Sequence, residues 1–143
     1  MNVYAETSAI LSWLFDDPQS PSIASVLNIA QRVFASKLTL VECERVLSRS
    51  RFTRALSEVH ASTCRSQLNS ASAHWTLIQI DDEVLDRARR PFPAEPLRTL
   101  DAIHVASALL ARRADPEVTL LSLDRRVRRC GALLGFPVHP AQM

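Results

Sequence analysis

Residues 100–113 read LDAIHVASALLARR, a stretch that is apolar almost all the way around a helical wheel. A helix of that kind is typically buried in the middle of a fold. Its polar exceptions are Asp101, His104 and Ser107, which follow one another at i+3 steps and therefore share one face. Because an unpaired buried carboxylate is costly, Asp101 needs a partner. The stretch predicts a central helix with a polar stripe that begins at an acid.

Short β-favouring runs alternate with longer helical patterns on both sides of this helix. We expect strands at residues 2–5, 33–35, 76–80, 118–121 and 136–139. Helices are expected near residues 7–16, 20–31, 37–51, 54–73, 82–90, 99–113 and 124–134. Strands separated by helices of this length imply parallel crossovers. The sequence therefore predicts an α/β fold, a three-layer α/β/α sandwich with a central, mostly parallel sheet.

The composition fits one globular domain that spans residues 1–143. The chain has 47% hydrophobic and 22% charged residues, which sets it apart from disordered tails. Gly131 and Gly135 are its only glycines, so a Gly-rich phosphate loop and a dinucleotide fingerprint are excluded. No stretch approaches the roughly 18 apolar residues of a membrane span, and the first residues lack a basic leader. We therefore predict a cytoplasmic protein with no membrane contact.

The cysteines and the basic residues add two weaker indications. Cys43, Cys64 and Cys130 form no C-x-x-C pair, which fits a reducing compartment and a role as small core residues. Lys37 is the only lysine among 17 basic residues. Arginine is suited to bidentate contact with phosphate or carboxylate, so this bias indicates an anionic partner, although a GC-rich genome would give the same bias.

Three further acids are expected near Asp101. Glu6 directly follows the first strand and Asp124 follows the strand at 118–121, and ligands of α/β sheets bind beyond such carboxyl ends. Glu42 lies beside the apolar stripe of its helix, whereas Glu44 is about 200° around the wheel from it. We therefore expect Glu42 to point inward and Glu44 to be solvated.

Four acids in one cleft would repel one another strongly, and a divalent cation would relieve that repulsion. Oxygen ligands favour Mg²⁺ or Mn²⁺, whereas zinc would require Cys and His at metal-ligand spacing, which the sequence lacks. A metal of this kind can generate hydroxide and stabilise a phosphodiester under attack. Because Mg²⁺ prefers oxygen, His104 is expected to be a hydrogen-bonding histidine of the core. Thr99 is expected to cap the helix that begins at Leu100.

The segments that carry these acids resemble a PIN domain, most closely the toxin ribonucleases of the VapC type. The resemblance covers essentially the whole chain in the right order, and Leu97-Arg-Thr-Leu-Asp-Ala-Ile-His104 is its most specific part. The other segments are Val3-Tyr-Ala-Glu-Thr-Ser-Ala-Ile-Leu11, Leu38-Thr-Leu-Val-Glu-Cys-Glu-Arg45, Leu121-Ser-Leu-Asp-Arg125 and Leu134-Gly-Phe-Pro-Val138.

The resemblance implies an endoribonuclease that depends on Mg²⁺ or Mn²⁺, hydrolyses RNA, forms a homodimer and is inhibited by a small cognate antitoxin protein. The four catalytic acids would be Glu6, Glu42, Asp101 and Asp124. Metal would be held by the first, third and fourth of these acids.

Two serines have supporting roles under the resemblance, and two arginines are predicted from their positions to bind substrate. Ser8 and Ser122 match the supporting hydroxyls of the family. Arg98 lies one turn before Asp101, and Arg125 follows Asp124, so both arginines are predicted to contact the RNA substrate.

One departure keeps a second interpretation open. The family usually has Asp at the first acidic position, and this chain has Glu6, whose extra methylene moves the carboxylate by about 1.5 Å. The alternative is therefore a catalytically silent PIN-like module that binds RNA or protein. A phosphoacceptor receiver domain would need a lysine after a late strand, and Lys37 is in the wrong place.

Overall fold

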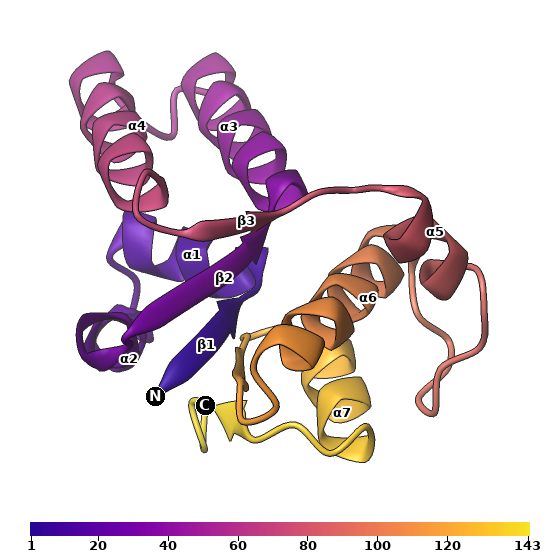
Figure 1. Cartoon of the computed structure of the whole chain (residues 1–143). Helices are drawn as coiled ribbons and strands as arrows, with labels where there is room; N and C mark the ends of the chain where they lie inside the picture. The colour runs from indigo at the N-terminus through magenta and orange to yellow at the C-terminus, as the bar shows by residue number, and fades with distance from the viewer.

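The computed structural model of the chain describes residues 1–143 and contains five strands and seven helices (Figure 1). The strands are β1 (Asn2–Ala5), β2 (Arg32–Ser36), β3 (Thr76–Ile78), β4 (Thr119–Leu121) and β5 (Val138–His139). The helices are α1 (Thr7–Phe15), α2 (Ser20–Ile29), α3 (Lys37–Phe52), α4 (Glu58–Ser72), α5 (Asp82–Ala88), α6 (Thr99–Ala114) and α7 (Arg125–Leu133).

All five strands pair in parallel, in the order β3-β2-β1-β4-β5. The chain first builds outward from β1 to β3 and then returns to the other side of β1 to add β4 and β5. The direction of winding therefore reverses between β1 and β4. Ligand sites of open α/β sheets lie at the carboxyl ends of the two strands that flank such a reversal.

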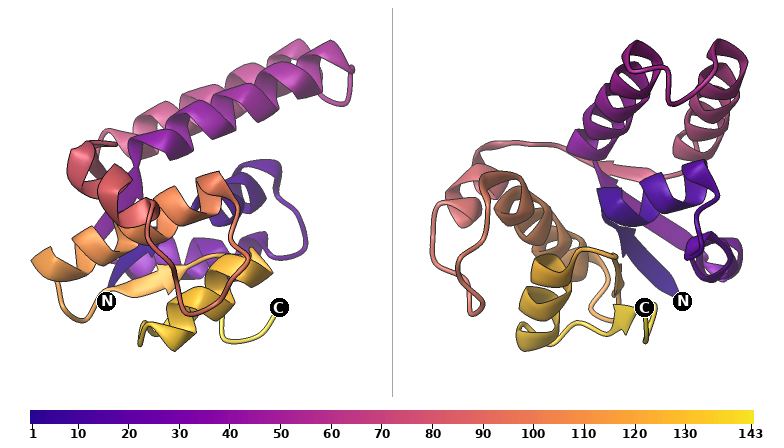
Figure 2. Two further views of the ribbon diagram at one scale, coloured as in Figure 1. Left: turned by 90° about the vertical axis from the view of Figure 1, so that its right-hand side faces the viewer. Right: turned by 180° about the vertical axis from the view of Figure 1, so that it is seen from behind.

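Helices cover both faces of the sheet, which confirms the predicted α/β sandwich (Figures 1 and 2). Successive strand residues point to opposite faces, so Val3 and Ala5 pack with α1 to α4, whereas Tyr4 packs with α5 to α7. Helix α6 supplies the most buried residues of the second layer, including Val105, Ala106 and Ala108. The apolar stretch at residues 100–113 therefore is the central helix that its pattern predicts.

The α3–α4 hairpin projects beyond the sheet, as both views of Figure 2 show. We expected the second of these helices to begin near residue 54, but α4 begins at Glu58. Arg54 has a positive φ of 62°, which interrupts the helical path, and the hydroxyl of Ser57 then accepts a hydrogen bond from the amide of His60 and caps α4.

The prediction that Thr99 caps the central helix is wrong. Helix α6 already includes Thr99, and the capping position is held by Arg98, which has an extended backbone and makes no side-chain cap. Asp101 therefore lies in the first turn, where a carboxylate is favourable beside the exposed amides.

The structure also tests the predictions about the cysteines and about membrane-spanning helices. All three cysteines are free and buried, as expected of small core residues. None of the helices combines the length and the apolar character that crossing a bilayer requires.

Candidate active site

The predicted acids gather at the carboxyl edge of the sheet because of where their elements begin. Glu6 is the residue between β1 and α1, and Asp124 caps α7 just after β4. These are the two strands that flank the reversal of winding. Glu42 lies in the second turn of α3, and Asp101 lies in the first turn of α6.

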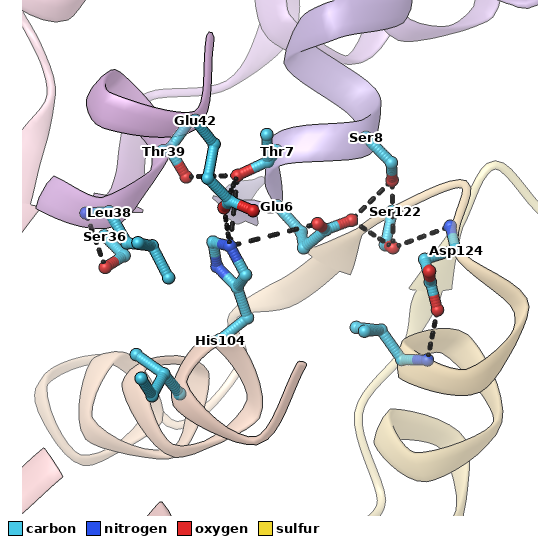
Figure 3. Close-up of polar contacts among 12 residues, drawn as sticks. Glu6, Thr7, Ser8, Ser36, Leu38, Thr39, Glu42, His104, Ser122 and Asp124 are labelled. Carbon is cyan, nitrogen blue, oxygen red and sulfur yellow. Dashed lines mark hydrogen bonds and ion pairs between the residues drawn. The ribbon is translucent and has the colours of Figure 1, made fainter. Parts of the chain in front are cut away.

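Glu42 is held by a buried histidine on the opposite layer of the fold (Figure 3). Its Oε1 atom lies 2.6 Å from His104 Nε2 and accepts a hydrogen bond of 2.7 Å from the Thr7 hydroxyl. Because a carboxylate only accepts, Nε2 of His104 carries the proton in this contact. The predictions that Glu42 points inward and that His104 is a hydrogen-bonding core residue are both confirmed.

The same histidine is fixed from its other side. The Tyr4 hydroxyl lies 3.0 Å from His104 Nδ1, and in the neutral ring it is the donor. Thr39 completes the group, with its hydroxyl 3.0 Å from that of Thr7. We call Tyr4, Thr7, Thr39, Glu42 and His104 the histidine cluster.

The surroundings of the histidine cluster change two pKa values in opposite directions. Burial raises the pKa of Tyr4 well above its ordinary value, and the charge on Glu6 raises it further. Partial burial also acts to raise the pKa of Glu42, but the hydrogen bonds from His104 and Thr7 outweigh burial and lower it. Glu42 is therefore a stable carboxylate, and Tyr4 is a stable phenol.

Glu6 lies between the histidine cluster and the end of β4, as Figure 3 shows. Its Oε2 atom accepts hydrogen bonds from the hydroxyls of Ser8 and Ser122, the latter at 2.8 Å. Its Oε1 atom lies 4.0 Å from His104 Nε2. The two serines therefore orient this almost fully buried carboxylate. Their role as the supporting hydroxyls of the family stays a prediction.

Asp101 and Asp124 face a shared hollow. This hollow has a volume of about 270 Å³ and is lined by Arg98, Asp101, Asp124, Arg125 and Arg126. Asp124 uses only Oδ1 to cap α7, accepting from the amides of Arg126 and Val127 at 2.9 Å. Neither aspartate forms an ion pair, although arginines line the same hollow.

The two aspartates, which we call the aspartate pair, repel each other. Burial raises the pKa of Asp101, and the negative charge of Asp124 raises it further. The backbone of Arg98 and the charge of its guanidinium offset only part of this effect. The aspartate pair therefore differs from the histidine cluster, in which every carboxylate contact is favourable.

The oxygen ligands at this edge fit a hydrated hard cation rather than a protein cage. No group of three or more Asp, Glu, His or Cys side chains is close enough to hold a metal ion. The structure thus does not bring Glu6, Asp101 and Asp124 together as one ligand set, because Oε2 of Glu6 is turned to the serines. Mg²⁺ commonly keeps several waters and binds through one or two carboxylates, so Asp101 and Asp124 are the two carboxylates of this hollow that could hold such an ion.

The arginines and Glu44 complete the account of the predicted residues. Arg98 and Arg125 both line the hollow, where their contact with a substrate stays a prediction. Glu44 is half-exposed and pairs with Arg65 of α4 at 2.9 Å, so it points away from the site but is not free in solvent.

Four residues of this edge were not among the predicted site residues. Tyr4, Thr7 and Thr39 belong to the histidine cluster, and Arg126 lines the hollow. Thr39 lies one helical turn before Glu42, and Thr7 directly follows Glu6, so a search for hydroxyls next to the predicted acids would have found both.

Comparisons with known proteins give the family of the chain. The family model described as PIN domain matches residues 3–133. The chain is 31% identical over 137 residues to Ribonuclease VapC46 of Mycobacterium tuberculosis, an alignment that covers 95% of each chain.

Solved structures show the same fold at low sequence identity. VapBC2 from Rickettsia felis, solved bound to a DNA fragment from its promoter, matches with a TM-score of 0.64 at 11% identity and covers 96% of this chain and 97% of the other. VapC20 of Mycobacterium tuberculosis, described as a toxin that cleaves the sarcin-ricin loop, matches with a TM-score of 0.64 at 13% identity over 94% and 95% of the two chains.

Proposed function

This chain belongs to the PIN-domain family, among the VapC ribonucleases, and we propose that it is a Mg²⁺- or Mn²⁺-dependent endoribonuclease that acts as the toxin of a toxin–antitoxin pair. Its ribonuclease activity is inferred from relatives that are named ribonucleases. The metal requirement, the role as a toxin and the individual site residues are proposals for this chain.

The observation that supports a metal-dependent reaction is the aspartate pair. Asp101 and Asp124 share one hollow at the reversal point of the sheet, repel each other and form no ion pair with the arginines that line it. Their like charges disfavour the folded state unless a cation lies between or beside them. An arrangement that costs stability in this way is typical of a functional site.

Each remaining acid has a separate task in this proposal. A bound Mg²⁺ or Mn²⁺ would supply a nucleophilic water and would stabilise the charge that develops on the phosphate. Asp101 and Asp124 would hold it. Glu6, held at Oε2 by the serines, offers Oε1 to orient a water molecule. Glu42 acts through His104 as a positioning residue, because its own Oε1 is already bound.

The arginines of the hollow would bind the substrate. Arg98 and Arg125 lie beside the two aspartates, and guanidinium groups bind phosphate oxygens with two parallel hydrogen bonds. The RNA phosphate would thus be held by the arginines while the scissile bond lies against the aspartate pair. Which RNA is cleaved depends on contacts outside this hollow.

The partners and location follow from the family in the same way. We propose a cognate antitoxin as the inhibitor, since related structures include toxin–antitoxin complexes, of which one comes from Klebsiella pneumoniae. A homodimer and a cytoplasmic location are proposed on the same ground.

The test is cleavage of a mixed cellular RNA pool by purified, antitoxin-free protein in Mg²⁺, in Mn²⁺ and in EDTA. The proposal expects discrete products in either metal, none in EDTA and none from Asp101→Asn. Glu44→Gln is the matched control, because Glu44 pairs with Arg65 outside the site. A folded parent that cleaves nothing in either metal would contradict the nuclease and favour the silent binding module.

A further inference from the structure

Helix α3 leads from the active site to the exposed tip of the α3–α4 hairpin. Glu42 lies in its second turn, and Phe52 is its last residue. A helix rises 1.5 Å per residue, so Phe52 lies about 15 Å along the axis from Glu42. In Figures 1 and 2 this end of α3 stands well clear of the sheet.

Four residues of α3 share one side of the helix. At about 100° per residue, Glu42, Arg45, Arg49 and Phe52 fall within about 80° of arc. Arg45, Arg49 and Phe52 also line one surface hollow, together with Ser48. We call Glu42, Arg45, Arg49 and Phe52 the α3 stripe.

Glu42 anchors the α3 stripe to the histidine cluster, but the other three residues of the stripe are not used by the packing of the protein. The buried residues Cys43 and Leu47 lie on the other side of α3, and Glu44 pairs with α4. Phe52 is 89% exposed, which is the highest value among the large hydrophobic residues.

Both arginines of the α3 stripe are also free. Neither Arg45 nor Arg49 takes part in any of the ion pairs or side-chain hydrogen bonds of the chain, whereas Arg51 donates to the carbonyl of Leu56. Two unpaired guanidinium groups therefore lead to an exposed aromatic ring.

We propose that the α3 stripe is a binding surface for single-stranded RNA, which guides the strand away from the active site. This inference rests on the proposed function. Arg45 and Arg49 bind successive phosphates, and an unpaired base stacks on the ring of Phe52. Single-stranded nucleic acids are bound by this combination of a positive track and a stacking platform.

The dimensions and charges favour RNA over the other occupants. Because a stacked strand rises about 3.4 Å per nucleotide, the 15 Å stripe corresponds to roughly four nucleotides beyond the scissile bond. A second copy docked with its α3 stripe against this one would place arginines against arginines. An apolar protein partner would need no aligned arginines between the ring and the active site.

The test measures RNA affinity in EDTA, so that cleavage cannot interfere. The probe is a fluorescent, unpaired RNA of about a dozen nucleotides, a length within the range that single-strand modules cover. Arg45→Ala/Arg49→Ala should reduce the slope of log affinity against log salt by about 1.4, since each lost phosphate contact in a single strand removes about 0.7. Arg89→Ala/Arg90→Ala makes the same charge change at the end of α5 and should have little effect on the slope.

The ring is tested separately. Phe52→Ala should weaken binding about fivefold or more, and Phe52→Trp should retain it, because stacking needs an aromatic face. Phe52→Leu keeps an apolar side chain without that face and should bind as weakly as the alanine variant. Val59→Ala, at another exposed apolar residue near the tip, is the control and should bind like the parent.

The outcomes separate this proposal from the nuclease itself. A parent that cleaves RNA in metal, together with stripe variants of unchanged affinity and salt slope, would overturn the α3 stripe alone. Equal affinity of Phe52→Leu and the parent would also overturn it and would indicate an apolar surface for a protein. A parent that binds RNA through the stripe but never cleaves would overturn the proposed function and leave the stripe standing.

Discussion

The histidine cluster and the aspartate pair stand at the same edge of one sheet and have opposite surroundings. In the histidine cluster, Glu42 receives hydrogen bonds from His104 and Thr7, and its pKa is lowered. In the aspartate pair, Asp101 faces Asp124 without an ion pair, and its pKa is raised. The first arrangement stabilises the fold, whereas the repulsion between the two aspartates in the second opposes folding. Acidic residues at the same edge of the sheet thus have different roles, because their hydrogen-bonding and charged neighbours differ.

The largest effect is expected from Asp124→Asn on RNA cleavage. Asparagine caps a helix about as well as aspartate, so this variant removes the charge and keeps the cap of α7. We expect cleavage to fall about a hundredfold or more, because a bound metal supplies several kcal/mol of transition-state stabilisation. Steady-state cleavage of a defined RNA measures this effect.

Asp124→Ala, which removes the cap of α7 as well as the charge, is the control for Asp124→Asn. Asp124→Ala should lose about 1 kcal/mol more of the free energy of unfolding than Asp124→Asn, since alanine cannot accept the two amide hydrogen bonds. Cleavage by Asp124→Asn at the rate of the parent would show that the charge has no catalytic role.

The next largest effect is expected from His104→Ala on stability. His104 is buried, and its removal leaves Glu42 and the Tyr4 hydroxyl without their partner. We expect a loss of about 3 kcal/mol, or roughly 10 °C in Tm, which chemical and thermal unfolding would measure.

Ser107→Ala is the matched control for the histidine variant. Ser107 is equally buried on the same face of α6 and lies beside Tyr4, but its hydroxyl donates to the carbonyl of Ile103 and bonds no carboxylate. Equal losses from the two variants would show that the histidine cluster adds nothing beyond ordinary packing.

A smaller effect is expected in the pH dependence of stability. The pKa of Glu42 is lower in the folded than in the unfolded chain, so the ionised carboxylate stabilises the fold. This contribution is complete above the ordinary pKa of 4.5 and is lost as the pH falls through the lowered pKa. Denaturant unfolding between neutral and acid pH should therefore show a steeper acid loss in the parent than in Glu42→Gln. Parallel curves would contradict the assignment.

Much of this comparison could be predicted from sequence. The wheel of α3 was enough to orient Glu42 inward, and the strand ends were enough to place Glu6 and Asp124 at one edge. Periodicity and strand positions carry such information because they depend on the chain locally.

The contacts across the fold could not be predicted in the same way. The bond between Tyr4 and His104 joins residues 100 positions apart, and no local pattern encodes that pairing. The orientation of Glu6 toward the serines depends equally on how β1 and β4 align. The start of α6 at Thr99 was missed because a threonine and an arginine are both compatible with the extended residue before a helix.

The smallest effect is expected from Asp101→Asn on stability, and it tests most directly the claim that the aspartate pair forms a cation site. The measurement is the Tm of the variant and of the parent at neutral pH, in EDTA and in Mn²⁺. Because the pKa of Asp101 is raised, its ionised form opposes folding above that pKa, and the neutral amide removes the opposition. The account predicts a Tm in EDTA that equals or exceeds that of the parent. The gain in the free energy of unfolding is at most about 1 kcal/mol, because water screens half-exposed charges. It also predicts that Mn²⁺ raises the Tm of the parent but not that of the variant. A variant that melts well below the parent in EDTA, and that Mn²⁺ stabilises as much as the parent, would contradict the claim that Asp101 and Asp124 form a cation site.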